Sequence, residues 1–383
     1  MMHLIKNAVM TLFLGSLLLG IESCGDRNRA ASRLAEDSED SQVLDSSLTF
    51  KNVTLEQADE EGRPFWKVDA LQATYDKDEQ LAQIQQPKGE LFQDGKLVYQ
   101  VEADTGEVEQ DGEKIFLKGN IIAKDVQSGA TLRGNELEWQ PREDLLIVRN
   151  KLTGTHPQVV ASAQEARLFS REQRMELEGN VLATAKDPNL KLKAEKLVWY
   201  TDQERIVSDQ PIEVEQYEAE QTTGRATGDQ AEVDLAKKIA ILKQNSQLTL
   251  QDPSMQIISE LFVWNVENET VVANQPITVN HLEQAINLSA NQARMDLKQQ
   301  IAYLTGNVKV LGQLDQSQLD ADKLTWYIDS QEVEAEGNVA YRRPDPPFDL
   351  RGPKAFGKFE NQTVVVSGGG GQVVTEIIPE GLE

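Results

Sequence analysis

Cysteine and histidine are scarce in this 383-residue chain, which has one cysteine, Cys24, and three histidines. A single thiol cannot form a disulfide within the chain, and no two histidines have the spacing of a metal site. The sequence also lacks a nucleophile elbow and a phosphate-binding loop. We therefore expect no catalytic residue, no metal site and no cofactor, and predict that the protein is not an enzyme. His156 and His281 are expected to be isolated surface residues.

Basic side chains are also in the minority. The 38 Lys and Arg residues face 63 Asp and Glu residues, which gives a formal net charge of -25. Such a charge repels the phosphates of nucleic acids and the surface of an anionic membrane. Nucleic-acid binding is therefore excluded, and contact with a membrane requires a dedicated anchor.

One apolar run, from Ala8 to Ile21, could provide that anchor. As a helix, its fourteen residues would cover about 21 Å, less than the ~30 Å hydrocarbon core, so a signal peptide is favoured. Cys24 follows a small residue at the end of the run, which resembles a bacterial lipobox and implies acylation of Cys24. An uncleaved signal anchor is the alternative. We predict an anchor or signal peptide over residues 1–24 and a polar, disordered linker over 25–47.

An internal repeat organises the rest of the sequence. A small residue, flanked by apolar positions, recurs every 29 to 34 residues, and sixteen residues after it comes a dipeptide that is usually turn-prone. The small residue falls at Ala70, Ala103, Gly134, Ala163, Ala194, Gly228, Ser259, Ala290, Ala321 and Gly352. The dipeptides are Gln86-Pro87, Gly119-Asn120, Asn150-Lys151, Gly179-Asn180, Gln210-Pro211, Gln244-Asn245, Gln275-Pro276, Gly306-Asn307, Gly337-Asn338 and Gly368-Gly369.

Within a unit, apolar residues alternate with polar ones at a spacing of two, which is typical of β-strands. Leu190, Leu192 and Ala194 share one face, and the phase then slips by one residue before Leu197 and Trp199. A bulge or bend at the small residue explains this slip. We predict an all-β fold of about ten stacked strand-hairpin repeats of ~31 residues, with two strands per unit, or three where the dipeptide splits the second.

The large apolar residues that end the pattern alternate with smaller ones from unit to unit. We expect consecutive units to lie on opposite sheets, so that large side chains meet small ones across the interior. If the two sheets leave an open trough, these residues line a groove for alkyl chains; a closed interior would be a plain core. The candidate groove-lining residues are Leu137, Trp139, Leu168, Leu197, Trp199, Phe262, Trp264, Met295, Leu324 and Trp326.

Several stretches resemble the LptC family of lipopolysaccharide export proteins. They are Leu55-Glu56-Gln57, Gly62 to Val68, Gly89-Glu90-Leu91-Phe92, Asp94-Gly95-Lys96 and Leu117 to Asn120. The later Gly-Asn-Val repeats are similar to the related OstA/LptA jelly-roll proteins. The resemblance implies an elongated β-jelly roll, with an LptC-like part at residues 48–190 and an OstA/LptA-like extension at 191–378.

The resemblance also implies a function. A protein of this kind accepts lipopolysaccharide from the subunits of an inner-membrane ABC transporter and passes it along an apolar groove towards the outer membrane. Its expected partners are therefore lipopolysaccharide, that transporter, and a downstream LptA-like or outer-membrane LptD-like jelly roll. Its expected location is the periplasm, anchored to the inner membrane. The alternative is a structural or adhesion lipoprotein with a closed β-solenoid.

Overall fold

The computed structural model describes residues 47–367 and 374–377, apart from short gaps at 59–60, 77–79, 110–111, 113, 157–158, 187–188, 219–220 and 359–362. The apolar run at residues 8–21, Cys24 and the predicted linker up to residue 46 lie outside the described residues. Within the described residues the secondary structure is β-strand throughout, except for one 3-10 turn, η1 (Pro141–Glu143), which confirms the predicted all-β class. No helix in the described part of the chain is long and apolar enough to cross a membrane.

The strands follow one another in chain order. Their bounds are β1 (Ser47–Ala58), β2 (Pro64–Asp76), β3 (Leu81–Gln85), β4 (Lys88–Gln93), β5 (Lys96–Glu102), β6 (Thr105–Glu109), β7 (Ile115–Asp125), β8 (Thr131–Gln140), β9 (Leu145–His156), β10 (Val159–Phe169), β11 (Arg174–Lys186), β12 (Asn189–Tyr200), β13 (Arg205–Ser208), β14 (Ile212–Glu218), β15 (Gln221–Gly228), β16 (Gln230–Asp234), β17 (Ile239–Leu250), β18 (Met255–Asn265), β19 (Thr270–Ala273), β20 (Ile277–His281), β21 (Ile286–Ala290), β22 (Gln292–Asp296), β23 (Ile301–Gly312), β24 (Gln318–Tyr327), β25 (Glu332–Pro344), β26 (Pro347–Lys358), β27 (Thr363–Ser367) and β28 (Val374–Ile377).

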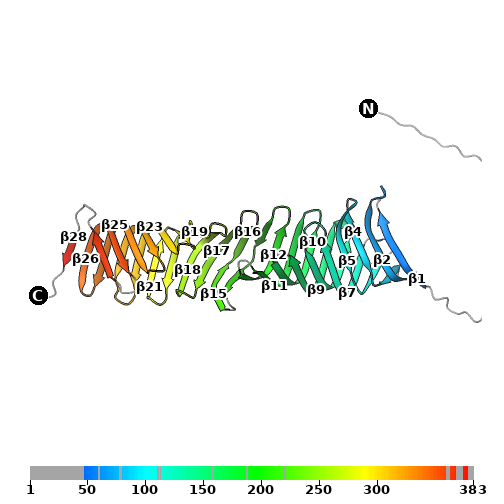
Figure 1. Cartoon of the computed structure of the whole chain (residues 1–383), viewed down its shortest axis with the longest axis horizontal. Helices are drawn as coiled ribbons and strands as arrows, with labels where there is room; N and C mark the ends of the chain where they lie inside the picture. The colour runs from blue at the N-terminus through cyan, green and yellow to red at the C-terminus, as the bar shows by residue number, and fades with distance from the viewer. Residues whose placement is uncertain are drawn as a thin grey trace, which may run out of the picture. The chain divides into compact units, whose positions relative to one another are not determined.

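These strands form one continuous antiparallel meander from β1 to β28 (Figure 1). A long strand pairs along its whole length with the long strands on either side, as β10 does with β9 and β11. Where a strand is split in two, each short part pairs with a different half of the neighbouring long strand, as β13 and β14 do with β12. The pairing continues across residue 190, where β12 lies between β11 and β14. The two predicted jelly-roll parts therefore share a single run of hydrogen-bonded strands.

Each long strand bends near its middle, and the bends lie in one row that we call the crease. In β11 the register shifts between Glu178 and Val181, around Gly179 and Asn180, whose φ angles are +79° and +48°. Gly and Asn tolerate this left-handed conformation better than other residues, which explains the turn-prone dipeptides in the sequence. Where the dipeptide contains Pro, the strand breaks in two, as between β13 and β14 at Gln210-Pro211.

A recurring side-chain hydrogen bond fixes the crease on its outer side. Asn120 Nδ2 donates to Asp104 Oδ2 at 2.8 Å, and Asn338 Nδ2 donates to Asp322 Oδ2 at 2.9 Å. The acceptor is in each case the residue directly after the small landmark residue. The two landmarks of the repeat therefore meet across neighbouring strands.

The crease divides the meander lengthwise into two facing half-sheets. Half-sheet A contains β4, β5, β14, β15, β20, β21, β28 and the parts of the long strands that pair with them; half-sheet B contains β3, β6, β13, β16, β19, β22, β27 and the remaining strand parts. Because every long strand crosses the crease, each unit belongs to both half-sheets. The expectation that consecutive units lie on opposite sheets is therefore wrong.

Alternate residues of both half-sheets face the interior and form the core. Buried apolar side chains gather in three clusters: residues 66–175, residues 181–231 and residues 255–355. Opposite the crease, the hairpin tips of the two half-sheets border a seam. The interior, bounded by crease and seam, is the candidate functional site.

Candidate functional site: the interior between the half-sheets

All ten predicted groove-lining residues lie on half-sheet B, at the alternate strand positions whose side chains face the interior. Leu137, Trp139, Leu168, Leu197, Phe262, Leu324 and Trp326 are buried, and Trp199, Trp264 and Met295 are partly exposed. The large and small members alternate along half-sheet B rather than across the interior. Contact of these residues with a ligand stays a prediction.

Three aromatic pairs join the half-sheets across the interior. The ring of Tyr99 on half-sheet A lies 6.2 Å from that of Trp139 on half-sheet B, at an interplanar angle of 74°. Farther along, the His156 and Trp199 rings are 5.9 Å apart, and so are the His281 and Trp326 rings. The first two pairs are edge-to-face, and the third is tilted, with an interplanar angle of 37°. An aromatic pair contributes about 0.5–1.5 kcal/mol beyond the area that it buries.

The histidines of these pairs were misjudged from the sequence. His281 is buried, with 3% of its surface exposed, and His156 is half-buried, so the expectation of isolated surface residues is wrong. For His281, the signal in the sequence is its position in the apolar alternation, because Ile277, Val279 and His281 share the inward face of one strand. Burial lowers the pKa of His281, and the Glu283 carboxylate opposes this with a smaller effect. A neutral imidazole fits an apolar interior.

The interior is tightly filled near the first pair. Trp139, Leu146 and Val148 are fully buried. Burial also raises the pKa of Tyr99, so its phenol is uncharged at neutral pH. The interior around Tyr99 and Trp139 is therefore closed.

The middle of the interior, from β12 to β18, is covered less completely. Leu192, Val214, Leu248 and Leu250 face inward and are nevertheless partly exposed. Trp264 in this section has no ring contact from half-sheet A within the described residues. Apolar side chains in the middle section can therefore be reached from the seam.

Ion pairs on the outer faces hold the strands of this middle section together. Glu232 accepts hydrogen bonds from Arg205 Nε at 2.8 Å and Lys243 Nζ at 2.7 Å. These two cations lower the pKa of Glu232 to about 2. On half-sheet A, Lys193 Nζ lies 2.7 Å from Glu213 Oε1 in a similar cross-strand pair. Networks of this kind are stabilising where single exposed pairs contribute little.

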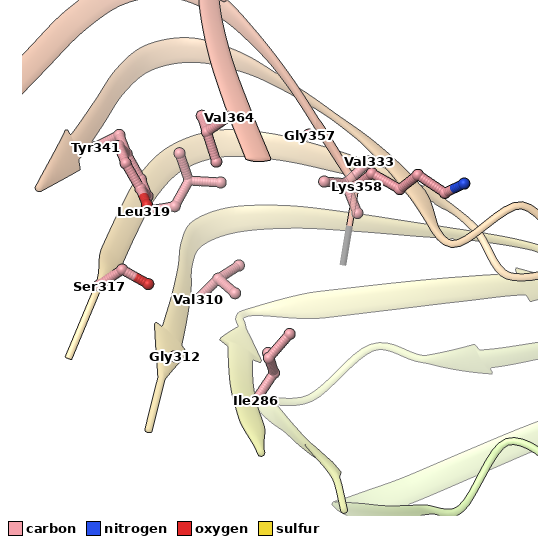
Figure 2. Close-up of a pocket in the computed structure, with 10 residues that line it drawn as sticks. All are labelled: Ile286, Val310, Gly312, Ser317, Leu319, Val333, Tyr341, Gly357, Lys358 and Val364. Carbon is pink, nitrogen blue, oxygen red and sulfur yellow. The ribbon is translucent and has the colours of Figure 1, made fainter. Parts of the chain in front are cut away.

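A small gap of about 60 Å³ lies between the half-sheets near the C-terminal end, partly open to solvent along the seam. Figure 2 shows Val310 and Leu319 of half-sheet A and Val364 of half-sheet B around the same space, with the Lys358 side chain extending away from it. The lining is mostly aliphatic and includes Gly312 and Gly357, which carry no side chain. A gap of this composition suits a hydrocarbon chain.

Polar chemistry is sparse in this interior. No group of three or more His, Cys, Asp or Glu side chains that could hold a metal ion occurs among the described residues. The charged networks point outward, away from the apolar lining. The arrangement of the described residues can enclose an apolar ligand.

The match to a family model agrees with the resemblance found in the sequence. A search of curated proteins found no match. A solved structure, "LptH, the LptA homologous periplasmic component of the conserved lipopolysaccharide transport device from Pseudomonas aeruginosa", is similar over 37% of this chain and 78% of that chain, with 10% sequence identity and a TM-score of 0.19. The family model "Lipopolysaccharide-assembly, LptC-related" matches residues 9–147, 145–251 and 269–369. The chain therefore belongs to the LptC-related family of lipopolysaccharide-assembly proteins.

Proposed function

We propose that this protein carries the acyl chains of lipopolysaccharide between its half-sheets, from an inner-membrane ABC transporter towards the outer membrane. The observation that carries the proposal is an inward-facing apolar surface that continues through all three clusters and is incompletely covered in the middle and near the C-terminal end. Membership of a lipopolysaccharide-assembly family supplies the identity of the lipid.

The energetic reason for an enclosed path is the cost of exposing hydrocarbon to water. At about 0.8 kcal/mol per methylene, a chain of ~12 carbons costs roughly 10 kcal/mol when it leaves a membrane unshielded. A carrier that crosses an aqueous compartment must therefore cover each chain that it moves. The strongly acidic outer face keeps the carrier itself in solution.

The location and the partners follow from this role. Residues 1–24 anchor the protein to the inner membrane, through acylated Cys24 or an uncleaved apolar segment, and the β-strands lie in the periplasm. Within the described residues the sheet ends at β1 and at β27 and β28, and strands of the transporter and of a downstream LptA-like or LptD-like jelly roll can add at these edges. The extension after residue 190 forms part of the bridge between the transporter and the downstream jelly roll. Intact lipid export in cells that lack residues 190–383 of the protein would contradict this role of the extension.

Photocrosslinking in cells tests the proposal. A photoreactive residue at Leu197 or at Phe262, both inward-facing, should give lipopolysaccharide adducts. The matched controls are the outward-facing neighbours Val198 and Val263, which should give none. Protein adducts alone at Leu197 and Phe262 would favour the closed structural or adhesion lipoprotein instead.

A further inference from the structure

One inward-facing pair at the crease is polar, whereas its counterparts are apolar. The equivalent cross-strand pairs combine a branched aliphatic residue with a small one: Val53 with Ala70, Ile121 with Gly134, Leu152 with Ala163, Val181 with Ala194, Ile277 with Ala290, Val308 with Ala321, and Val339 with Gly352. Between β17 and β18 the pair is Ser246 with Ser259. A hydroxyl thus stands where other units place a valine, isoleucine or leucine.

On the other side of Ser246 lies Gly228, the small residue of the preceding unit, which also has no aliphatic side chain. A Cβ atom on Gly228 would lie 3.4 Å from Ser246 Oγ, so the glycine and the serine are neighbours in the crease row. The row runs from Ile212 through Gly228, Ser246 and Ser259 to Ile277. We call Gly228, Ser246 and Ser259 the crease notch, because three successive strands lack the aliphatic bulk found on either side.

The two hydroxyls of the crease notch are buried and have no hydrogen-bond partner. Ser246 is 0% exposed and Ser259 is 4% exposed, and neither Oγ atom has a partner. Leaving a buried polar group unsatisfied destabilises the fold. Rotating one hydroxyl towards the other would still leave one O–H donor without an acceptor. Packing alone favours an aliphatic residue here, as in the other units.

The crease notch belongs to the middle section, whose inward-facing apolar residues are partly exposed. Ser259 and Trp264 are both inward-facing on β18, with Ser259 at the crease and Trp264 towards the seam, five residues or roughly 16 Å apart along the strand. The indole Nε1 of Trp264 is likewise buried without a partner. Apolar residues such as Leu242 and Leu248 lie in the same pair of strands. A ligand that enters at the seam would meet apolar surface first and hydrogen-bonding groups at the end.

We propose that the crease notch binds an oxygen atom carried on an acyl chain, a hydroxyl or a carbonyl some distance from the head group. This inference rests on the proposed function and adds to it a preference for oxygen-bearing chains. The Ser246 and Ser259 hydroxyls donate to that oxygen or accept from it, and the aliphatic neighbours contact the rest of the chain. Ser246 and Ser259 therefore determine specificity rather than overall affinity.

The test compares two fatty acids that differ only by a hydroxyl group. Binding of 12-hydroxyoctadecanoic acid and of octadecanoic acid to the full chain is measured by displacement of a fluorescent fatty acid. We expect the hydroxylated chain to bind about fivefold more tightly, since one hydrogen bond contributes on the order of 1 kcal/mol net.

The informative variant is Ser246→Val/Ser259→Ala, which reproduces the Val308 and Ala321 pair of another unit and should therefore fold. It should bind octadecanoic acid as the wild type does and lose the preference for the hydroxylated chain. Ser289→Ala is the matched control, because Ser289 points outward between Leu288 and Ala290 and its loss should leave the preference unchanged.

The outcomes separate this inference from the proposed function. Equal binding of both fatty acids by the wild type, or a preference that survives in Ser246→Val/Ser259→Ala, would overturn the role of the crease notch and leave the lipid carrier intact. Failure of the wild type to bind either fatty acid would overturn both.

Discussion

Replacing Trp139 and Trp264 by alanine, one at a time, should show that the interior is closed at one place and open at another. Trp139 is fully buried and packs edge-on against Tyr99, with ring centroids 6.2 Å apart. Trp→Ala at such a position typically costs about 3–5 kcal/mol. Trp264 is partly exposed and lacks a ring partner from half-sheet A within the described residues, so Trp264→Ala should cost about 1–2 kcal/mol, a typical value for a single substitution.

Hydrogen–deuterium exchange is the suitable assay, because a repeat protein opens in parts and a single unfolding midpoint would mix them. Trp139→Ala should speed exchange in β7 to β9 by about two to three orders of magnitude, since 1.4 kcal/mol corresponds to a factor of ten. Trp264→Ala should speed exchange in β17 to β19 by about tenfold. Equal effects of the two substitutions would refute the distinction between a closed and an open section.

Three further predictions follow from the crease, the ion pairs and the gap. Gly337→Ala should destabilise the crease by about 1–2 kcal/mol or more, because its φ is +77° and the new Cβ would collide with the Asp322 side chain. Asp322→Ala removes the colliding carboxylate but also the hydrogen bond from Asn338, so Gly337→Ala should cost less in thermal unfolding when it is introduced into Asp322→Ala than into the wild type; an equal cost in both backgrounds would contradict this. The folded-state pKa of Glu232 lies near 2, below its ordinary value of 4.5, so the unfolded chain binds more protons between these pH values and the wild type loses stability as pH falls from 4.5 to 2. Glu232→Gln should not show this loss when melting temperatures are measured from pH 6 to pH 2. Parallel curves of melting temperature against pH for the two proteins would disprove the prediction. Gly357→Leu should fill the gap near Leu319 and reduce the yield of lipid adducts from a photoreactive residue at Val364. Phe356→Leu, at an exposed outward position, should leave the adduct yield unchanged. Equal adduct yields in the two variants would show that lipid does not pass through the gap.

The positions of strands and bends could be predicted because they depend on local chemistry. The period of two in Leu190, Leu192 and Ala194 defines a strand face, and the Gly179-Asn180 dipeptide defines a bend through its positive φ angles. The register of β11 with β12 brings these signals together as expected. Local residue preferences therefore determined most of the architecture that the sequence predicted.

The arrangement across the interior could not be predicted, because it depends on how every strand crosses the crease. Whether Trp199 faces another tryptophan or His156 is decided by contacts between residues more than forty positions apart. The division into a closed and an open section likewise depends on which side chains happen to lie opposite Trp139 and Trp264. The polar crease pair was present in the sequence as Ser259, but its partner Ser246 could be recognised only once the register was known.

Native mass spectrometry of the full-length protein, purified in mild detergent from cells that make lipopolysaccharide, tests the central claim most directly. We expect a bound mass that corresponds to a lipid with several acyl chains and that is reduced in Gly357→Leu. A wild-type protein that retains no lipid under conditions in which a known lipid carrier keeps its own would contradict the claim that acyl chains lie between the half-sheets.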